Sequence, residues 1–311
     1  MIRRMPSKPS SSRLRVRRRY RLATRWARML PSFLIIGAQR AGTTSLFDAL
    51  RRHPDVTGPA AYEDFVRLRK EVHFFDHRFE NGLDWYRSFF PLTVRRRLAR
   101  RRGGDLVVGE STPYYLFHPH VPARVAATLP DVRLIALLRD PVERAYSHYQ
   151  HRNRAGYEKL SFAEALAAED ERLAGGDELI LTDKRYRRHH YNHAYFRRGL
   201  YAEQLERWLE LFPREQLLVL RSEDFFAQPA ETYAEALEFI GVRPSPREKF
   251  RHRNKASYAP IDPALRAELE ERYAEPNARL AELLGRDFGW GSPGVRAGDV
   301  ARASSGSARG R

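Results

Sequence analysis

The stretch that decides the fold is Phe33-Leu-Ile-Ile-Gly-Ala-Gln-Arg-Ala-Gly-Thr-Thr-Ser-Leu46. Its apolar start predicts a buried strand, a turn with glycine at both ends follows, and a helical pattern begins at Thr43. A strand, turn and helix of this kind cradles phosphate, because backbone amides and the positive end of the helix dipole face the anion. We therefore predict an anion site formed by the amides of Ala41 to Thr44 and the hydroxyls of Thr43 and Thr44.

The loop differs from a nucleoside-triphosphate loop at one decisive position. The spacing Gly37-x4-Gly42 is that of a P-loop, but a P-loop continues with Lys and Ser/Thr, whereas Thr43 and Thr44 follow here. Arg40 instead places a permanent cation inside the loop. A donor without β- and γ-phosphates needs no magnesium clamp, so one cation and the amides can neutralise its developing charge. The alternative is an ordinary strand-turn-helix corner without a ligand.

Outward from this loop, strands and helices alternate. Apolar runs at 33–36, 106–108, 134–138 and 217–220 predict buried parallel strands. Helical patterns follow at 43–52, 121–129, 142–153, 162–173, 200–211 and 230–240, with a C-terminal pair of helices within 263–284. This alternation predicts a single α/β domain whose P-loop-like parallel sheet carries helices on both faces. Ligands of such sheets bind beyond the carboxyl ends of the strands.

A second polar turn follows the strand at 134–138. Asp140 is expected to cap the next helix and Pro141 to occupy its first position. Arg139 ends the strand and Ser147 lies about two turns into the helix, so both are expected to face a site beside the first loop. An arginine and a serine hydroxyl suit a second phosphate group.

Charge divides the chain into three expected parts. The formal net charge is +17, and the first thirty residues carry eleven Lys or Arg and no acid. We expect a disordered or loosely helical arm at 1–31, a catalytic domain at 32–290 and a disordered tail at 291–311. The arm is either a solubilising segment or a weak contact with an anionic membrane surface. No export signal or membrane span is predicted, so a cytoplasmic location, alternatively at the membrane periphery, is the expectation.

Several further motifs occur in order along the chain. They are Lys70-Glu-Val-His-Phe-Phe-Asp76, Gly82-Leu-Asp-Trp-Tyr86, Gly109-Glu-Ser-Thr-Pro-Tyr-Tyr115, Leu200-Tyr-Ala-Glu-Gln-Leu-Glu-Arg-Trp208 and Leu284-Gly-Arg-Asp-Phe-Gly-Trp290. With the two turns they make the chain, over about 33–290, similar to the sulfotransferases that use 3'-phosphoadenosine-5'-phosphosulfate (PAPS). Its closest resemblance is to the sulfotransferase domains of heparan sulfate modification. The resemblance implies a metal-independent transfer of a sulfuryl group to a carbohydrate or glycolipid.

The resemblance also implies roles for single residues. Arg40 matches the loop lysine that contacts the transferred group, Glu71 a proposed general base and His73 its supporting histidine. Lys255 matches a lysine in a loop that closes over the cofactor. The donor site implied in this way comprises Gln39, Arg40, Ala41, Gly42, Thr43, Thr44, Arg139, Ser147, Lys255 and Ser257.

The chain departs from the family at four points. Arginine replaces the loop lysine, so a proton-donating role there is not expected. Ser111 stands where some relatives have a catalytic lysine, and Ser257 stands where an arginine is usual. The family's late disulfide cannot form, because the sequence contains no cysteine.

Two carboxylates compete for the role of general base. If 70–76 is extended, Glu71 and His73 project to the same face, and the pair can accept a hydroxyl proton. The alternative is a surface glutamate beside a packed histidine. Glu110, at the end of the second predicted strand, is the second candidate for the base, or an acceptor that orients the sugar.

The remaining polar clusters favour no metal site. His118-x-His120 and His189-His190-x-x-His193 lack a carboxylate-supported catalytic spacing, so no metal is expected. The aromatics and arginines of 186–196 are expected either to stack on an anionic sugar chain or to form a basic, partly buried helix face. The charged segment 159–193 is expected to be a surface insertion.

Two other functions remain open on the sequence alone. One is an ATP-dependent phosphotransferase on a P-loop scaffold, which the missing Gly-Lys-Ser/Thr argues against. The other is a non-catalytic polyanion-binding protein that uses the basic arm. Nucleic acid is not an expected partner.

Overall fold

The computed structural model describes residue 16 and residues 19–59, 71–243 and 259–291. Within them five parallel strands form one sheet in the order β2-β3-β1-β4-β5. The strands are β1 (Phe33–Gly37), β2 (Val56–Thr57), β3 (Val107–Ser111), β4 (Arg133–Leu138) and β5 (Leu217–Arg221). The four predicted strands are confirmed, and β2, which has only two residues, was not predicted.

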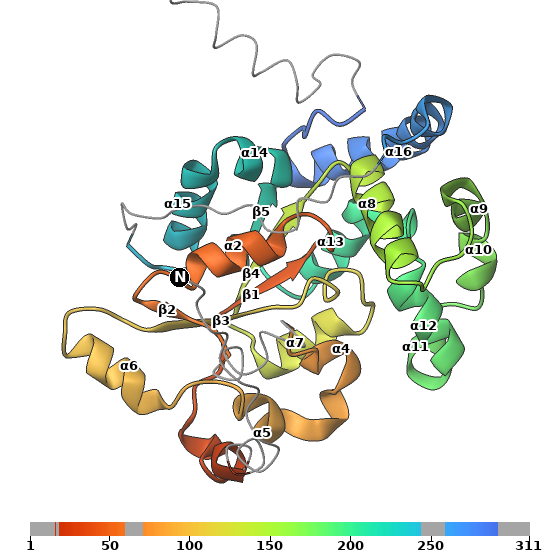
Figure 1. The fold of residues 1–311 in the computed structure, drawn as a ribbon. Helices are drawn as coiled ribbons and strands as arrows, with labels where there is room; N and C mark the ends of the chain where they lie inside the picture. The colour runs from red at the N-terminus through yellow and green to blue at the C-terminus, as the bar shows by residue number, and fades with distance from the viewer. Residues whose placement is uncertain (1–15, 17–18, 60–70, 244–258, 292–311) are drawn as a thin grey trace, which may run out of the picture.

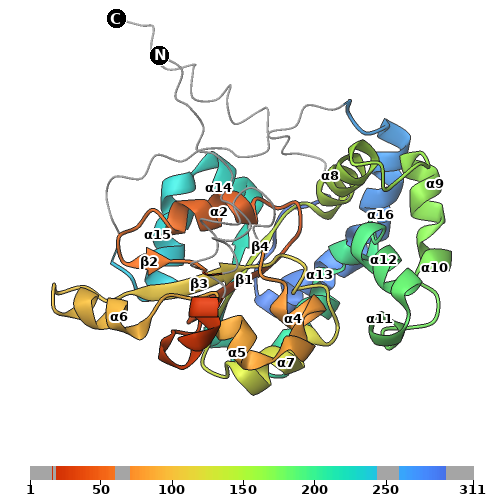
Figure 2. The same ribbon diagram turned by 60° about the horizontal axis from the view of Figure 1, so that its bottom comes forward.

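Helices cover both faces of this sheet, as predicted. Their bounds are α2 (Thr43–Leu50), α4 (Phe74–His77), α5 (Gly82–Arg87), α6 (Thr93–Arg100), α7 (Val121–Thr128), α8 (Pro141–Arg154), α9 (Phe162–Ala167), α10 (Glu169–Arg172), α11 (Leu179–Thr182), α12 (Lys184–Asn192), α13 (Tyr201–Leu209), α14 (Ser222–Ala227), α15 (Pro229–Phe239) and α16 (Pro263–Leu284). Short 3-10 turns are η1 (Arg25–Ala27), η2 (Phe79–Asn81), η3 (Arg197–Gly199) and η4 (Arg214–Gln216). Figures 1 and 2 show α2, α14 and α15 on one face and α4, α5 and α7 on the other.

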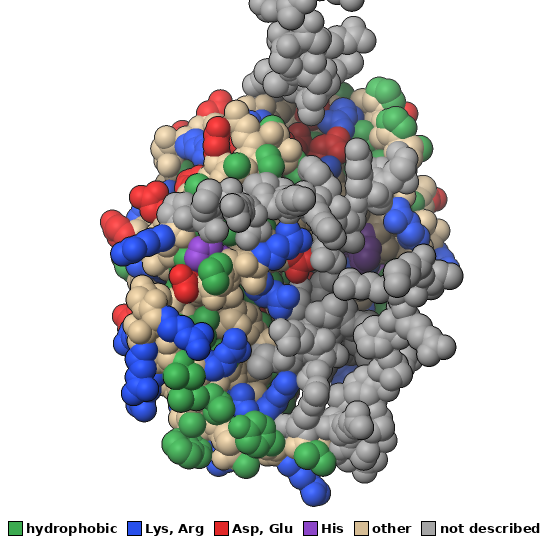
Figure 3. Space-filling view, turned by 60° about the vertical axis from the view of Figure 1, so that its left-hand side comes forward, with side chains coloured by type: hydrophobic (Ala, Val, Ile, Leu, Met, Phe, Trp, Pro, Cys, Tyr) green, Lys and Arg blue, Asp and Glu red, His purple; other side chains and the backbone are tan. Residues whose placement is uncertain are grey.

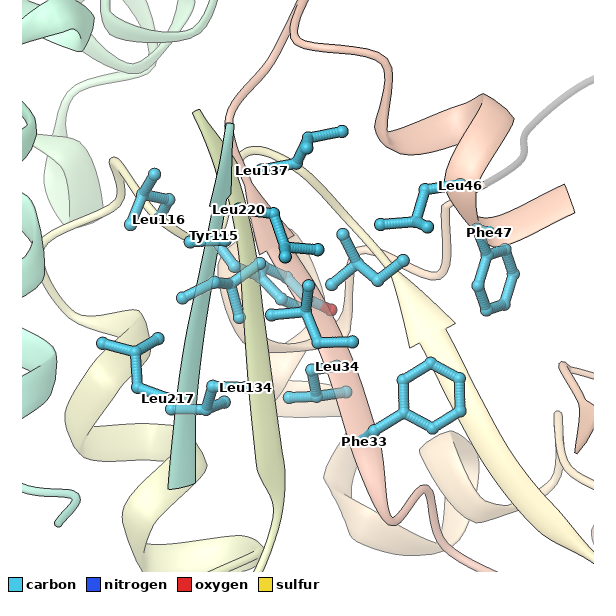
Figure 4. Packing of buried hydrophobic residues seen from close by; sticks show 14 of the residues in the cluster. Phe33, Leu34, Leu46, Phe47, Tyr115, Leu116, Leu134, Leu137, Leu217 and Leu220 are labelled. Carbon is cyan, nitrogen blue, oxygen red and sulfur yellow. The ribbon is translucent and has the colours of Figure 1, made fainter. Parts of the chain in front are cut away.

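The core is built where the strands meet these helices. The labelled side chains of Figure 4 come from β1, β4, β5, α2 and the segment after β3, and all are buried. Gly109 on β3 makes room for the ring of Phe33, because a Cβ there would lie 2.0 Å from that ring. Burying a leucine or phenylalanine side chain contributes about 1.5–3 kcal/mol, so this layer fixes the strands and the loops that leave them.

Two helix predictions need correction. The expected pair of C-terminal helices is the single helix α16, which continues through Pro276. Leu269 and Tyr273 before the proline and Leu280 after it are buried, so packing on both sides holds the helix continuous. Conversely, the helix expected over 162–173 is divided into α9 and α10.

Part of the expected N-terminal arm is folded. Residues 19–23 are helical and η1 follows, where Arg25 pairs with Asp84 at 2.7 Å. Arg28 is buried and donates to the carbonyl of Phe90 at 2.7 Å. The last residues of the arm therefore pack on the domain, whereas 1–15 and most of the expected C-terminal tail lie outside the described residues.

The predicted insertion at 159–193 contains α9 to α12, which lie to one side of the sheet with α8 and α16 (Figure 1). No helix among the described residues is long and apolar enough to cross a membrane.

Candidate active site

The loop after β1 adopts a backbone conformation that requires glycine at position 42. Gly42 has φ 98°, and a Cβ there would lie 2.7 Å from the ring of Phe226, so both backbone and space exclude a side chain. Arg40 also has a positive φ, of 80°. The loop is held at both ends, because the Ala38 amide donates to Leu137 at 2.8 Å and the Ser222 hydroxyl donates to Ala41 at 2.7 Å.

The N–H groups of Gly42, Thr43 and Thr44 open α2, and a helix leaves such groups without an intrahelical acceptor. The amide of Ala41 differs, because it closes a turn to the carbonyl of Ala38 at 3.2 Å. Thr43 is buried and Thr44 is half-buried. In the predicted anion site, which we call the anion loop (residues 37–44), the amides without a helical acceptor therefore begin at Gly42 rather than at Ala41.

We call the loop after β1 and the Arg139–Ser147 pair the two anchors, and the structure brings them together. Arg40 Nε donates to Ser147 Oγ at 3.3 Å, and Arg139 Nη1 donates to the carbonyl of Arg40 at 3.3 Å. Arg139 also pairs with Glu143 at 3.2 Å. Two guanidinium groups and one hydroxyl thus converge beside the loop, at the carboxyl ends of β1 and β4.

The turn before α8 is capped as predicted. The Asp140 carboxylate accepts the amides of Val142 at 2.8 Å and Glu143 at 3.1 Å, and Pro141 opens the helix. This cap sets the direction of α8 and so places Ser147 opposite the loop.

Arg198 is a site residue that the sequence did not reveal. It is buried, its Nη1 donates to Gln39 Oε1, and its Nη2 donates to the carbonyls of His190 and Tyr191 at 2.9 Å. Burial lowers the pKa of Arg198 to about 9, so the group remains a cation at neutral pH. It fixes the side chain of Gln39 and links the loop to the carboxyl end of α12.

The surroundings of the loop are strongly positive. Burial, followed by the charges of Arg198, Arg152, Arg144 and Arg40, holds the pKa of His148 well below its ordinary value. The fully buried imidazole is therefore neutral at pH 7. Such a concentration of cations is suited to a ligand with several negative charges.

A second polar unit lies at the start of α4. His73 Nε2 is 2.9 Å from Glu71 Oε2, and His73 Nδ1 is 2.6 Å from Asp76 Oδ2. The segment is not extended at His73, which has φ 54° and occupies the N-cap position of the helix that begins at Phe74. This backbone turn, rather than strand alternation, brings the imidazole between the two carboxylates.

The two carboxylates set the charge of this histidine. Burial lowers the pKa of His73, but Asp76 and then Glu71 raise it by more, so the pKa lies well above its ordinary value. Burial raises the pKa of Asp76, yet His73 opposes this and leaves it below its ordinary value. Asp76 is fully enclosed, whereas the Glu71 side chain is 30% exposed and accessible to a ligand.

Aromatic contacts connect this unit with the loop. The ring of His73 lies 6.1 Å from that of Tyr191, and the guanidinium of Arg198 lies 5.9 Å from the same ring. Since Arg198 also holds Gln39, Tyr191 lies between the His73 unit and the anion loop.

Glu110 is placed differently. It is buried, and its carboxylate accepts the hydroxyls of Tyr86, Thr112 at 2.8 Å and Tyr115 at 2.8 Å. Burial raises its pKa, although these three hydrogen bonds oppose the shift. Tyr115 also accepts the amide of Phe74 at 3.0 Å, so Glu110 braces the start of α4. This geometry favours Glu71 as the base.

The other predicted residues contribute less to the site. Ser111 is buried, and Lys255 and Ser257 lie outside the described residues. Tyr186 and Tyr195 pack inward, which favours a basic, partly buried face for 186–196 rather than stacking on a sugar. Among the described residues, His73, Asp76 and His77 lie close enough together to hold a metal ion, a grouping that the sequence did not predict.

The sequence matches the sulfotransferase domain family over residues 30–260. A human relative, heparan sulfate glucosamine 3-O-sulfotransferase 6, is 29% identical over 85% of this chain and 75% of its own. A Dictyostelium discoideum relative, membrane-associated sulfotransferase kil1, is 27% identical over 84% of this chain and 66% of its own.

A solved sulfotransferase structure from Alicyclobacillus acidocaldarius is 32% identical, covers 84% of this chain and 98% of its own, and superposes with a TM-score of 0.61. The family match spans the loop after β1, the residues Arg139 and Ser147, and all five strands of the sheet. The chain therefore belongs to the sulfotransferase family.

Proposed function

We propose that this enzyme transfers a sulfuryl group from PAPS to a hydroxyl or amine of a carbohydrate or glycolipid. The observation that carries the proposal is the convergence of Arg40, Arg139 and Ser147 on one loop. The donor has phosphate groups at both ends of its ribose, and the two anchors supply cations and donors for both.

Each anchor has its own task. The amides of 42–44, with Arg40, hold the 5'-phosphosulfate, while Arg139 and Ser147 hold the 3'-phosphate. Gln39, fixed by Arg198, orients the transferred group, and Lys255 and Ser257 are proposed to complete the donor site. Thr43 and Thr44 add hydroxyl donors.

The transfer is an in-line displacement at sulfur. The acceptor oxygen or nitrogen forms the new bond to sulfur while the bond from sulfur to the bridging oxygen breaks. The electron pair of that bond remains on the 5'-phosphate of the departing 3',5'-ADP. Arg40 stabilises this charge without giving up a proton, because a guanidinium stays protonated.

Glu71 accepts the acceptor's proton as the new bond forms. His73 holds this carboxylate by its Nε2, and the buried Asp76 fixes the imidazole through its Nδ1. The exposure of Glu71 and the burial of Asp76 support this division between base and positioning residue.

The acceptor class is inferred from relatives. One is named a heparan sulfate glucosamine 3-O-sulfotransferase, and another, 30% identical over 82% of this chain and 30% of its own, a bifunctional heparan sulfate N-deacetylase/N-sulfotransferase. A carbohydrate hydroxyl or amine therefore fits both names. Metal independence, a cytoplasmic location and a membrane contact through the basic arm belong to the same proposal.

Calorimetric titration with 3',5'-ADP tests the donor site. The titration is run without magnesium, with ATP as the control ligand and with EDTA to remove any ion near His73. Arg139→Ala should weaken binding about 10- to 100-fold, the value of one hydrogen bond to a charged group. Arg279→Ala, which removes an ion pair between α16 and Glu206 of α13, is the matched control and should bind normally.

The outcomes separate the candidate functions. Binding that needs no metal and that Arg139→Ala weakens supports the donor assignment. A preference for ATP with magnesium would instead support the phosphotransferase reading and overturn the proposal.

A further inference from the structure

One exposed surface combines large apolar side chains with arginine. Trp26 is 77% exposed, Val94 50%, Leu98 47% and Leu83 38%. We call these four residues, with Arg95, Arg97, Arg101 and Arg102, the basic-apolar patch. Tryptophan is enriched at protein and membrane interfaces, and an exposed apolar patch that contains it often marks an interaction site.

Three segments bring the patch together. Thr93 Oγ1 donates to the carbonyl of Ala27 at 2.8 Å, and the amide of Met29 donates to Pro91 at 2.9 Å, so η1 lies against the start of α6. The ion pair between Arg25 and Asp84 ties η1 to α5. Near the foot of Figure 3, hydrophobic side chains gather with Lys and Arg among them.

Helix α6 presents its apolar stripe between arginines. Val94 and Leu98 are four residues apart and share one face, and Arg95 and Arg97 lie on either side of it. Arg96 and Arg100, on the opposite face, pair with Asp105 at 2.8 and 3.1 Å. Within the described part of the chain, the four arginines of the patch form no ion pair, so their charge faces outward.

The patch lies away from the candidate active site. Segment η1 leads into the amino end of β1, and α6 leads into that of β3, whereas the anion loop and Arg139 follow the carboxyl ends of β1 and β4. A partner bound to the patch therefore lies at the other end of the strands from the loop after β1.

We propose that the basic-apolar patch docks this enzyme on the surface of an anionic lipid bilayer. Trp26 and the aliphatic side chains enter the headgroup region, and the arginines contact the lipid phosphates. A second copy of the chain would bring the same arginines face to face and is disfavoured by repulsion. The stretch 13–21, which precedes η1 in the sequence, carries six further arginines and so adds charge of the same sign. This inference does not depend on the proposed reaction.

Vesicle flotation with the full chain tests the proposal. Phosphatidylcholine vesicles are compared with vesicles that also contain phosphatidylglycerol. The combined variant Arg95→Gln, Arg97→Gln and Arg101→Gln should weaken binding to the anionic vesicles about 100-fold, at about fivefold for each arginine. The control variant Lys184→Gln, Arg185→Gln and Arg188→Gln removes equal charge from exposed positions of α12 and should bind as the parent does.

Trp26 supplies a local readout. Lipids brominated in their acyl chains should quench the fluorescence of the parent, and Trp26→Ser should remove most of this quenching. Both patch variants should retain the parent's affinity for 3',5'-ADP, which shows that they are folded and separates this test from that of the donor site.

Several results would overturn the inference. One is equal binding to neutral and anionic vesicles, and another is equal loss in the α12 control. A third is a dimer in sedimentation that the patch variants dissociate without any change in vesicle binding. Binding to DNA that Trp26→Ser does not affect, with no vesicle binding, would identify a polyanion site instead.

Discussion

Arg40 Nε lies 3.3 Å from Ser147 Oγ, which joins the loop after β1 to the helix after β4. Arg139 donates to the backbone carbonyl of Arg40, so the two guanidinium groups lie beside the same residue of the loop. We therefore expect the three side chains to have different roles: Arg40 acts in the transfer step, whereas Arg139 and Ser147 bind the donor.

Replacing Arg40 should mainly affect the transfer step. If its cation meets charge that develops as the sulfur–oxygen bond breaks, Arg40→Ala should lower kcat about 100- to 1,000-fold. Ser147→Ala should weaken 3',5'-ADP binding about 10-fold, the lower end of the effect expected for a hydrogen bond to a charged group. Steady-state kinetics beside calorimetry separates the two, and an Arg40→Ala enzyme with normal kcat would contradict the assignment.

Glu71→Gln should stop proton removal while leaving the donor site intact. General-base catalysis contributes about 100- to 10,000-fold, so kcat should fall within that range and 3',5'-ADP binding should not change. Glu80→Gln, an exposed acid on η2, is the control and should retain full activity. Restoration of activity at high pH in Glu71→Gln would point to a different base.

The charge on His73 should govern the alkaline limb of the pH profile. Its raised pKa keeps it protonated above its ordinary range, and activity that needs this form is lost as pH rises through that pKa. Asp76→Asn removes the carboxylate that raises the pKa most, so the limb should move to lower pH. Asp105→Asn, at a residue before the amino end of β3, should leave the limb in place, and an unmoved limb in Asp76→Asn would exclude His73 as the titrating group.

Strands and helices with a clear pattern of apolar residues could be predicted from the sequence. Elements whose extent depends on packing against the rest of the fold could not. Four strands appear as apolar runs, but β2 consists of Val56 and Thr57 only and leaves no pattern. The expected pair of C-terminal helices is one helix, because Tyr273 and Leu280 are buried on either side of its internal proline and hold it continuous.

The same limit applies to the site. Glu71 and His73 were found through a motif, but their contact depends on the left-handed backbone of His73, and Asp76 joins them through the first turn of α4. In the sequence Arg198 cannot be told from its neighbour Arg197, which is only half-buried. Only the surrounding aromatic rings of Tyr114, Phe117 and Tyr191 show why one arginine turns inward.

The contact between Arg198 and Gln39 should appear as coupling between the two side chains. Arg198→Met and Gln39→Ala should each weaken 3',5'-ADP binding, but the double variant should lose less than the sum of the two. A coupling of about 0.5–3 kcal/mol is expected for residues in one hydrogen-bond network. Additive losses in calorimetry would show that Arg198 does not act through Gln39.

His118 should make the fold sensitive to acid. Burial holds its pKa at about 3, so the unfolded chain takes up a proton below its ordinary pKa that the folded chain does not. Stability should therefore be complete above about pH 6.5 and fall by about 1.4 kcal/mol per pH unit below it for this group. His118→Asn, which keeps an acceptor for the amide of His120, should have a shallower slope in acid, measured by denaturant unfolding. The difference in stability between variant and parent should be constant above pH 7.5, and parallel slopes below pH 6.5 would refute the prediction.

Gly109 should tolerate no side chain while Phe33 lies against it. A Cβ at this position would meet the ring of Phe33 at 2.0 Å, and β1 and β3 are paired at these two residues, so neither backbone can move freely. Gly109→Ala should lower the free energy of unfolding by about 1–3 kcal/mol, the usual effect of overpacking a core. Phe33→Leu removes the ring edge and should recover part of that loss in the double variant, although it destabilises the parent. Two additive losses in urea unfolding would mean that the strain lies elsewhere, whereas recovery would show that this one close approach sets the spacing between the strand that carries the anion loop and its neighbour.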